Sequence, residues 1–562
     1  MARPVPVRDM TSRDPAVTIT IYETRKTITM SPARPEATHV AVRDGRILGA
    51  GTLEELERWG DYTLDTTFAD KVLMPGFVEG HAHSSAGSVW DGSYLGWFDR
   101  ADPDGTVWAG LKDVDAVVAR LTTFAEANPD EPLVIGWGLD PIYMDNVRVT
   151  RADLDRACAD RPIVIMHASG HIMNMNTKGL KIAGLLKPGV NHPGIPLGSD
   201  GMPIGELRSP EVMGPAGAKV GFDRGKAIEG STEGLRSYGR LCVRAGVTTA
   251  TDLARSLTDE SVTQALAITG EADFPICLVP FRIMLGMSPE DLVNFTAGIK
   301  KRSTERCDLG RIKVVADGSI QGFTARLLWP GYQNGAPNGL WYVAPEQMAE
   351  IFERALDAGV LVHTHTNGNE ATQLAVETLE AALKKVPSRD HRFTLQHCQL
   401  ATPAQFRKMA RLGMCANLFS NHHFYWGDEH YALTVGPERA ERMNACRTAL
   451  DSGVAMAIHS DAPVTPLGPL FTAWAAVNRI TASGRTLGEG EKISVDEALR
   501  AITLGAAYTL KMDHQIGSIE AGKRADFAVL EEDPYAVAPD ALKDVQVWGT
   551  VQGGRVFAAA EI

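Results

Sequence analysis

Two histidines stand one residue apart in the segment GFVEGHAH, directly after an apolar run. They are His81 and His83. Because side chains alternate along an extended strand, both imidazoles would lie on one face of a strand through this segment. Two neutral imidazoles on one face can hold a divalent cation. A single HxH pair also arises by chance, so the segment alone leaves open whether the pair binds a metal or merely alternates.

Four later apolar runs carry residues of a compatible kind. They are Lys313 in RIKVVADG, His365 in GVLVHTH, His397 in RFTLQH and Asp461 in GVAMAIHSD. An aspartate adds a hard anionic oxygen to imidazole nitrogens, and zinc accepts such a mixed set, as do manganese, iron and nickel. Each side chain lies at or near the C-terminal end of its run. This joint placement predicts a site for one or two divalent ions, with zinc as the favoured metal.

Several of these residues also have an ordinary structural interpretation. His397 can be a hydrogen-bonded core histidine, and one of His363 and His365 can be structural. The Ser460-Asp461 pair can cap a helix, which is what serine and aspartate usually do before a helix. The metal site is favoured because all the candidate residues lie at or near the C-terminal ends of successive predicted strands.

Lys313 has two interpretations that the sequence leaves open. A lysine that faces the interior is costly unless its charge is paired, and Asp317 is the simplest partner. Burial in a cation-rich site would instead lower the lysine pKa and favour carbamylation by carbon dioxide, which makes a carboxylate able to bridge two metals. Asp317 is also a rival candidate for the bridging carboxylate.

The elements that must position these residues recur along the middle of the chain as apolar runs separated by helix-like stretches. The runs are residues 72–81, 246–253, 275–284, 311–318, 359–365, 392–397, 413–418 and 453–461. Strand alternating with helix predicts βαβ units and a parallel sheet. Eight strands predict an α/β fold with a TIM-type barrel, whose active site lies at the C-terminal ends of the strands.

Two regions lie outside that alternation. Residues from about 88 to 245 are far more than one crossover needs, so a large inserted subdomain is expected after the first barrel strand. Both chain ends look β-rich, and Asp44-Gly45 between two apolar runs predicts a hairpin. We therefore expect a composite β-domain from residues 1–71 and 510–562, and a barrel domain over 72–509.

The composition limits which binding partners and which cellular compartment are expected for the protein. The formal net charge of −13 argues against a general nucleic-acid binder. No window offers eighteen uninterrupted apolar residues, so no membrane span is expected, and the polar first residues predict no signal peptide. The seven cysteines include no CxxC pair, which is typical of reduced thiols in a cytoplasmic protein. A small-molecule substrate fits these limits, and a homo-oligomer is left open.

The motifs LMPGFVEGHAH, HSDAP and the closing GSIEAGKRADFAVLEEDP resemble the amidohydrolase superfamily. The segments KVVADGSIQG, HTHTNGNEA and SDAPVTPLGPLFTAWAAVNR are similar to its YtcJ-like subgroup, which includes N-substituted formamide deformylases. The resemblance runs from about residue 38 to 557. It implies a metal-bearing barrel with a small β-sandwich built from both chain ends. It also implies the metal ligands His81, His83, Lys313, His365, His397 and Asp461, with Lys313 as the bridging, carbamylated ligand and Asp461 also as base.

Two positions depart from the pattern. Glu79 stands where the family usually has aspartate before the HxH segment, and Gly368-Asn369 replaces the subgroup's Gly-Asp. Neither departure removes an expected ligand, but each can change a hydrogen bond behind one.

The expected reaction is hydrolysis of an amide or other carbon–nitrogen bond by metal-activated water, with Asp461 as the general base. Substrate contacts are expected from His171, Ser319 and His422. A deaminase of the same superfamily and a catalytically inactive barrel kept as a binding protein are the alternatives.

Overall fold

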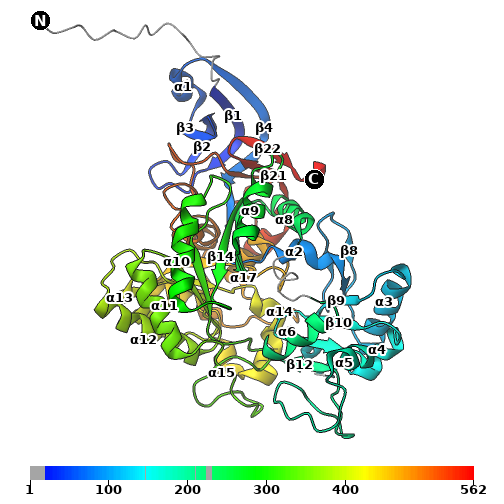
Figure 1. Cartoon of the computed structure of the whole chain (residues 1–562). Helices are drawn as coiled ribbons and strands as arrows, with labels where there is room; N and C mark the ends of the chain where they lie inside the picture. The colour runs from blue at the N-terminus through cyan, green and yellow to red at the C-terminus, as the bar shows by residue number, and fades with distance from the viewer. Residues whose placement is uncertain (1–18, 146, 209, 223–230) are drawn as a thin grey trace, which may run out of the picture.

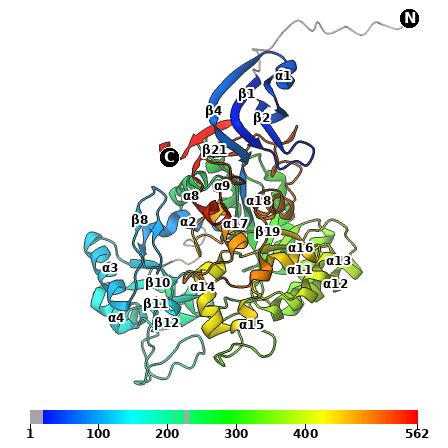
Figure 2. The same ribbon diagram turned by 180° about the vertical axis from the view of Figure 1, so that it is seen from behind.

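The computed structural model describes residues 19–145, 147–208, 210–222 and 231–562. Within these residues the chain forms a central barrel, a sheet that contains strands from both chain ends, and an inserted subdomain at the side (Figures 1 and 2). The prediction about a signal peptide falls on residues 1–18, which lie outside the described part.

Eight parallel strands form the barrel sheet. They are β5 (Phe77–Glu79), β13 (Val247–Arg255), β14 (Cys277–Ile283), β15 (Arg311–Val315), β16 (Leu361–Thr366), β17 (Thr394–His397), β18 (Cys415–Leu418) and β19 (Ala455–Ile458). They are hydrogen-bonded in the order of the chain, and every neighbouring pair is parallel. All eight predicted runs overlap one of these strands, which confirms the predicted TIM-type fold.

The ring closes at the residues that were predicted to bind metal. In the described part of the chain, β5 and β19 share no ladder and stand at the two ends of the hydrogen-bonded order. The segments that follow them are nevertheless joined, because the Asp461 amide donates to the His81 carbonyl at 3.0 Å and the His83 amide donates to the Ala462 carbonyl at 2.8 Å. The backbone therefore holds the first and last candidate ligands side by side.

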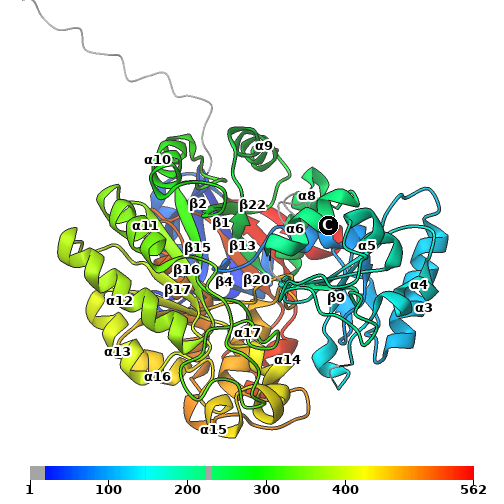
Figure 3. The same ribbon diagram turned by 60° about the horizontal axis from the view of Figure 1, so that its bottom comes forward.

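Helices cover the outside of the barrel (Figure 3). They include α10 (Pro289–Ile299), α11 (Pro345–Asp357), α12 (Asn369–Lys385), α13 (Pro403–Leu412) and α16 (Cys446–Asp451). In α11, Met348, Ile351, Phe352 and Ala355 are buried and recur at the spacing of one helical face. Burial of such faces against the strands fixes the strand ends, and with them the site.

Strands from both chain ends join in one seven-stranded sheet. Its order is β22 (Arg555–Ala558), β21 (Val547–Gln552), β20 (Phe527–Leu530), β4 (Tyr62–Pro75), β1 (Ile19–Ile28), β2 (Glu36–Arg43) and β3 (Arg46–Gly51). The predicted hairpin at Asp44-Gly45 joins β2 to β3, and both turn residues have positive φ, at 53° and 70°. Side chains from β2 and β21, such as Val40 and Val551, share one apolar cluster, so the sheet curls around a small core.

The inserted region between β5 and β13 contains its own sheet. The strand order is β12 (Glu206–Arg208), β11 (Ile172–Met175), β10 (Ile163–His167), β9 (Val134–Leu139) and β6 (Ser93–Tyr94). The helices α3 (Val114–Ala127), α4 (Arg151–Ala157), α5 (Thr177–Ala183) and α6 (Pro210–Lys219) belong to this region, which has two apolar clusters of its own. The last helix of this region is α8 (Thr232–Arg244), which leads into β13.

Two smaller predictions concern helices and thiols. None of the helices in the described ranges is long and apolar enough to cross a membrane. All seven cysteines are unpaired thiols, and six of them are buried.

Candidate active site

A cavity of about 1030 Å³ opens at the C-terminal ends of the barrel strands. All six predicted metal ligands line it: His81, His83, Lys313, His365, His397 and Asp461. His171 and Trp137 of the inserted subdomain also line it, so the barrel and the insertion build the cavity together. The position is where a parallel barrel places its active site.

His81, His83 and Asp461 converge on one point. Asp461 Oδ1 lies 3.3 Å from His81 Nε2 and 3.2 Å from His83 Nε2, and the three ligand atoms form a group suited to a metal ion. Asp461 Oδ1 is buried and has no hydrogen-bond partner among the described residues. A carboxylate oxygen and two imidazole nitrogens that meet in this way fit a divalent cation, which would satisfy all three.

A chain of hydrogen bonds sets the protonation of His81. His81 Nδ1 lies 2.7 Å from Gln396 Oε1, and Gln396 Nε2 lies 2.7 Å from His363 Nδ1. His363 Nε2 lies 3.0 Å from the Thr509 carbonyl, to which it donates. Because the Thr509 carbonyl can only accept, His363 Nδ1 accepts from Gln396 Nε2, and Gln396 Oε1 accepts from His81 Nδ1. His81 Nε2 is left without a proton and can bind a cation. His363 is therefore the structural member of the HTH pair.

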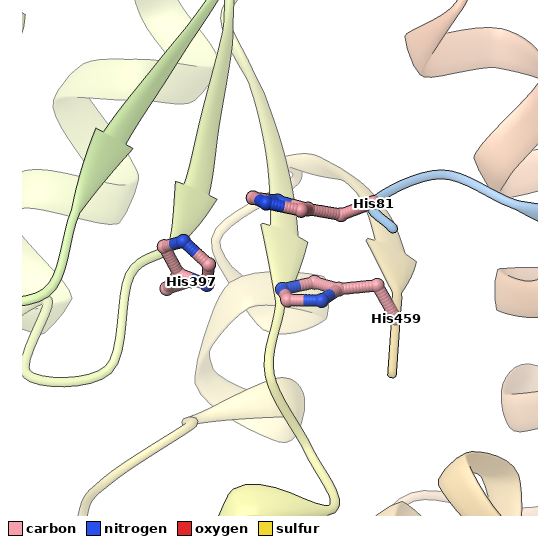
Figure 4. A group of neighbouring side chains, drawn as sticks. All are labelled: His81, His397 and His459. Carbon is pink, nitrogen blue, oxygen red and sulfur yellow. The ribbon is translucent and has the colours of Figure 1, made fainter. Parts of the chain in front are cut away.

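His397 lies beside His459, which was not among the predicted ligands. His81, His397 and His459 present nitrogens that all lie within 4.8 Å of one another (Figure 4). The rings of His81 and His459 are stacked at 4.6 Å, and that of His397 lies 4.5 Å from His81. Burial lowers the pKa of His81, His397 and His459 well below the usual value, so all three are neutral and able to bind a cation.

His365 completes the group of imidazoles. Its ring lies 4.5 Å from that of His397, and its Nε2 lies 3.1 Å from the Gly318 carbonyl. The Gly318 carbonyl accepts from this nitrogen when it carries the proton, and Nδ1 then keeps the lone pair. His365 is in the cavity wall but outside the two groups of converging ligand atoms.

Lys313 lies against the metal-compatible residues and not against Asp317. Its Nζ lies 3.3 Å from His81 Nε2. Among the described residues, no carboxylate lies within ion-pair distance of Nζ, so the predicted salt bridge with Asp317 is absent. Burial lowers the pKa of Lys313 to about 7, although the nearby Asp461 charge raises it. A substantial fraction of the amine is then neutral near pH 7, which is the form that carbon dioxide carbamylates.

The Asp317 side chain binds backbone amides of two loops. Its carboxylate accepts from the amides of Asn367 at 2.9 Å, Gly368 at 2.8 Å and Arg326 at 3.0 Å. These bonds fix the loop after β16 to the loop after β15. The interpretation of Asp317 as a bridging metal ligand is therefore not supported by its hydrogen bonds.

The two departures from the family pattern have visible contacts. Glu79 accepts from Ser460 Oγ at 2.7 Å and from the His81 amide at 3.2 Å, so it ties β5 to the segment after β19. Asn369 Oδ1 accepts from the Leu328 amide at 2.9 Å, which joins the start of α12 to a neighbouring loop.

Asp461 caps no helix, which contradicts the capping interpretation of Ser460-Asp461. The next helix, α17 (Pro469–Asn478), begins several residues later and has Gly468 at its N-cap. Asp461 also has a φ of 56°, and His397 has a φ of 71°. Non-glycine residues in this left-handed region are strained, and such strain gathers at functional sites.

The three residues predicted to contact substrate lie in different places. His171 lines the cavity, and its ring lies 6.1 Å from that of His365. Ser319 and His422 are buried but are not among the residues that line the cavity. His422 instead stacks on Trp426 and its Nδ1 lies 3.2 Å from His430 Nε2, because the helix that carries it packs its ring inward.

His459 and Gln396 were not among the site residues predicted from the sequence. A usable signal existed for His459, because it stands two residues before Asp461 and therefore on the same side of an extended segment. Gln396 gave no such signal, since its role depends on the neighbours that the fold brings to its amide.

The residues fit a divalent metal. The described residues include no hydrogen-bond partner for either ring nitrogen of His397 or His459, although both rings are buried. Buried polar atoms are almost always satisfied, so a cluster of unsatisfied lone pairs indicates a cation site.

Comparison with known proteins agrees with this geometry. The model of the family described as "Amidohydrolase family" matches residues 69–558. The chain belongs to the amidohydrolase family. This amidohydrolase is 26% identical over 538 residues to YtcJ of Bacillus subtilis (strain 168), a match that covers 92% of the chain and 95% of the relative. It is 25% identical to the N-substituted formamide deformylase of Arthrobacter pascens, over 92% of the chain and 94% of that protein.

A solved structure shares the fold of this amidohydrolase. The crystal structure of an uncharacterized metal-dependent hydrolase from Pyrococcus horikoshii OT3 matches with a TM-score of 0.70 and 18% identity, covering 93% of this chain and 99% of that one. The family and the ligand cluster together make the chain a metal-dependent amidohydrolase.

Proposed function

We propose that this amidohydrolase cleaves the amide bond of a small N-substituted amide, with Asp461 as the general base. The observation that carries the proposal is the contact of Asp461 Oδ1 with His81 Nε2 and His83 Nε2 at 3.3 and 3.2 Å in the wall of a large cavity. A carboxylate in this position can take a proton from water and return it to a leaving nitrogen.

The ligand set proposed for the metal is His81, His83, Lys313, His365, His397 and Asp461. Zinc suits these mixed nitrogen and oxygen donors, with one or two ions per chain. When bound, the metal lowers the pKa of water and polarises a carbonyl. Carbamylation of Lys313 is part of the proposal, supported by its burial and by a pKa of about 7.

The cavity wall supports a substrate with an apolar substituent. The apolar residues Ile135, Trp137, Met284, Trp341 and Val464 also line the cavity. The apolar surface would bind the nitrogen substituent. His171, whose ring lies 6.1 Å from that of His365, is proposed to contact the acyl group. The similarity to an N-substituted formamide deformylase supports the same substrate class.

The test is a screen of N-formyl, N-acyl and cyclic amides with zinc-loaded enzyme, scored for amine release. The proposal expects amine release that stops after exhaustive chelation and returns with zinc. Release of ammonia from a ring amidine, with one ion bound and no change in Lys313→Ala, would establish the deaminase alternative. Retained metal without turnover of any substrate would favour the inactive binding protein.

The place of action proposed for the enzyme is the cytoplasm. The seven unpaired cysteines support it, because thiols persist where the redox poise is reducing.

A further inference from the structure

Arg100 reaches from the inserted subdomain to the segment that follows Asp461. It is the first residue of β7 (Arg100–Ala101), a short strand of the inserted region. Its Nη1 donates to the Pro463 carbonyl at 2.7 Å, and its Nη2 donates to the Thr465 carbonyl at 3.0 Å. The guanidinium therefore binds two backbone groups that closely follow the proposed base in the chain.

The charge of Arg100 serves these two carbonyls and not an ion pair. Within the described ranges, no carboxylate lies within ion-pair distance of its guanidinium. Burial lowers the pKa of Arg100, but a guanidinium keeps its proton in proteins. Hydrogen bonds from a charged donor are stronger than those between neutral groups. Two such bonds to one short stretch of backbone restrict how that stretch can move.

The segment that Arg100 holds carries a strained residue. Asp461 has a φ of 56°, and its carbonyl accepts from the Val464 amide at 2.7 Å, which closes a turn. A non-glycine residue keeps such a conformation only where the surrounding contacts over-determine it. Asn421 supplies one of these contacts from the barrel, since its Nδ2 donates to Thr465 Oγ1 at 2.9 Å. Arg100 supplies two more from the inserted subdomain.

The same guanidinium lies against a residue of the cavity wall. Arg100 Cζ is 5.0 Å from the centroid of the Trp137 ring, a distance at which a cation and an aromatic ring attract each other. Trp137 and Pro463 both line the cavity, whereas Arg100 is not one of the described residues that line it. Arg100 therefore joins the wall proposed for the nitrogen substituent to the segment of the base, without reaching the substrate.

Other contacts also fasten the inserted subdomain to the barrel. Tyr143 Oη donates to the Tyr425 carbonyl at 2.8 Å, and Trp426 Nε1 donates to Asp140 Oδ2 at 2.9 Å. Docking of the subdomain therefore does not depend on Arg100 alone. The contacts of Arg100 differ in their end point, because they end on the segment that carries the proposed base.

We propose that Arg100 is a positioning residue, which fixes the Asp461 carboxylate relative to the Trp137 wall of the cavity. The inference rests on the proposed function, since it takes Asp461 as the base. Without the guanidinium, the carbonyls of Pro463 and Thr465 lose their donors and the segment is free to shift. Proton transfer depends steeply on position, so the rate falls. Arg100 touches neither the substrate nor the metal ligands, so their binding should change less.

The test is a double-mutant cycle of Arg100→Met and Asp461→Asn, with kcat and KM measured on one amide at saturating zinc. Methionine keeps an unbranched side chain but has no donor. The control is Arg161→Met, because Arg161 belongs to the same subdomain and donates to the backbone carbonyls of Ala125 and Asn128 at 2.6 and 2.7 Å. Zinc content, circular dichroism and hydrogen–deuterium exchange of a peptide covering residues 460–465 are measured on each protein.

Arg100→Met should lower kcat by about tenfold or more, with KM and zinc content within about threefold of wild type. Residues 460–465 should exchange faster. Arg161→Met should show neither change. In the Asp461→Asn background, Arg100→Met should lower kcat no more than about twofold further, because the group that it positions is already gone.

A kcat loss of the same size in both backgrounds would overturn the proposal, since Arg100 would then act on the fold in general. An unchanged kcat in Arg100→Met would overturn it as well. If Arg100→Met does not fold, Arg100→Lys is judged by the same cycle. Wild-type protein that releases amine from no amide would end the proposed function. The exchange of residues 460–465 would then decide by itself whether Arg100 holds the segment.

Discussion

Glu79 and Ser460 join the first and the last strand of the barrel. Glu79 Oε2 accepts from Ser460 Oγ at 2.7 Å, and the Ser460 amide lies 3.3 Å from Oε1. These two strands share no ladder in the described part of the chain. The side-chain contact therefore adds to the two backbone hydrogen bonds that join the segments after the strands. The contact lies directly behind His81 and Asp461, and it therefore positions both ends of the ligand group.

Glu79→Ala should weaken metal binding by about tenfold or more, because it frees the segments that carry His81 and Asp461. It should also lower the thermal midpoint, since the Ser460 amide loses a buried acceptor. Burial raises the pKa of Glu79 to about 8, so below that pH the group is mostly a neutral acid. Glu79→Gln imitates that form and should retain most of the affinity. Equal affinities in Glu79→Ala and wild type would contradict the role given to this contact.

Gln396→Leu should reduce metal affinity by about 10–100-fold, the usual range for residues that orient a ligand. The leucine cannot accept from His81 Nδ1, so the ring is free to turn and to change its protonated nitrogen. Chelator competition measures the effect. A matched control is Gln399→Leu, because Gln399 is a buried glutamine nearby whose amide has no hydrogen-bond partner among the described residues. If both variants lose metal affinity equally, the cause is a general loss of packing around β17 and not the loss of the hydrogen bond to His81.

The fold was readable from the sequence because each barrel strand is a buried apolar run between helical stretches. Hydrophobic periodicity reports burial directly, and the eight runs required no knowledge of side-chain partners. The placement of His81, His83 and Asp461 in one cavity also followed, because parallel strands carry their C-terminal ends to one side. The sequence did not predict the five-stranded sheet in the insertion, where the strands are short and irregularly spaced.

The details of the site depended on partners that only the fold brings together. Asp317 is close to Lys313 in the chain, yet three backbone amides of other loops hold its carboxylate. His422 was expected at the substrate, but its helix turns the ring toward Trp426 and His430. Such choices rest on hydrogen bonds between distant segments, and local patterns do not encode them.

Acid should destabilise the inserted subdomain through His167. Burial lowers the pKa of His167 to about 4, while an unfolded histidine titrates near 6.5. The unfolded chain therefore binds more protons between those values, and the stability present above about pH 6.5 is lost as the pH falls towards 4. At pH 5 the protonation of His167 in the unfolded chain lowers the free energy of unfolding by about 2 kcal/mol.

The measurement is the thermal midpoint of metal-free protein at pH 7 and pH 5, for wild type and for His167→Gln. Glutamine keeps a donor for Asn174, the partner of His167 Nε2, but does not titrate in this range. The midpoint of the variant should fall less between the two pH values, since the other buried histidines contribute equally to both proteins. Parallel losses in the two proteins would show that His167 is not a source of the acid sensitivity.

Asp461→Asn should leave the fold intact and lower kcat by at least about a hundredfold, because an amide cannot accept a proton at neutral pH and general base catalysis is typically worth about 10²–10⁴-fold. Asparagine keeps the size and one oxygen, so metal affinity should fall only modestly. The left-handed φ of 56° at this position also suits asparagine, which tolerates that region better than most residues.

Three measurements are needed on the same preparation: the thermal midpoint, the zinc content and kcat on the best amide from the screen. Asp461→Ala is the companion variant, because it removes the oxygen as well and should show no further loss in kcat if proton transfer is the main role. A variant Asp461→Asn with full zinc content and a near-normal kcat would remove Asp461 from the chemistry and leave His171, which lines the same cavity, as the next base to test.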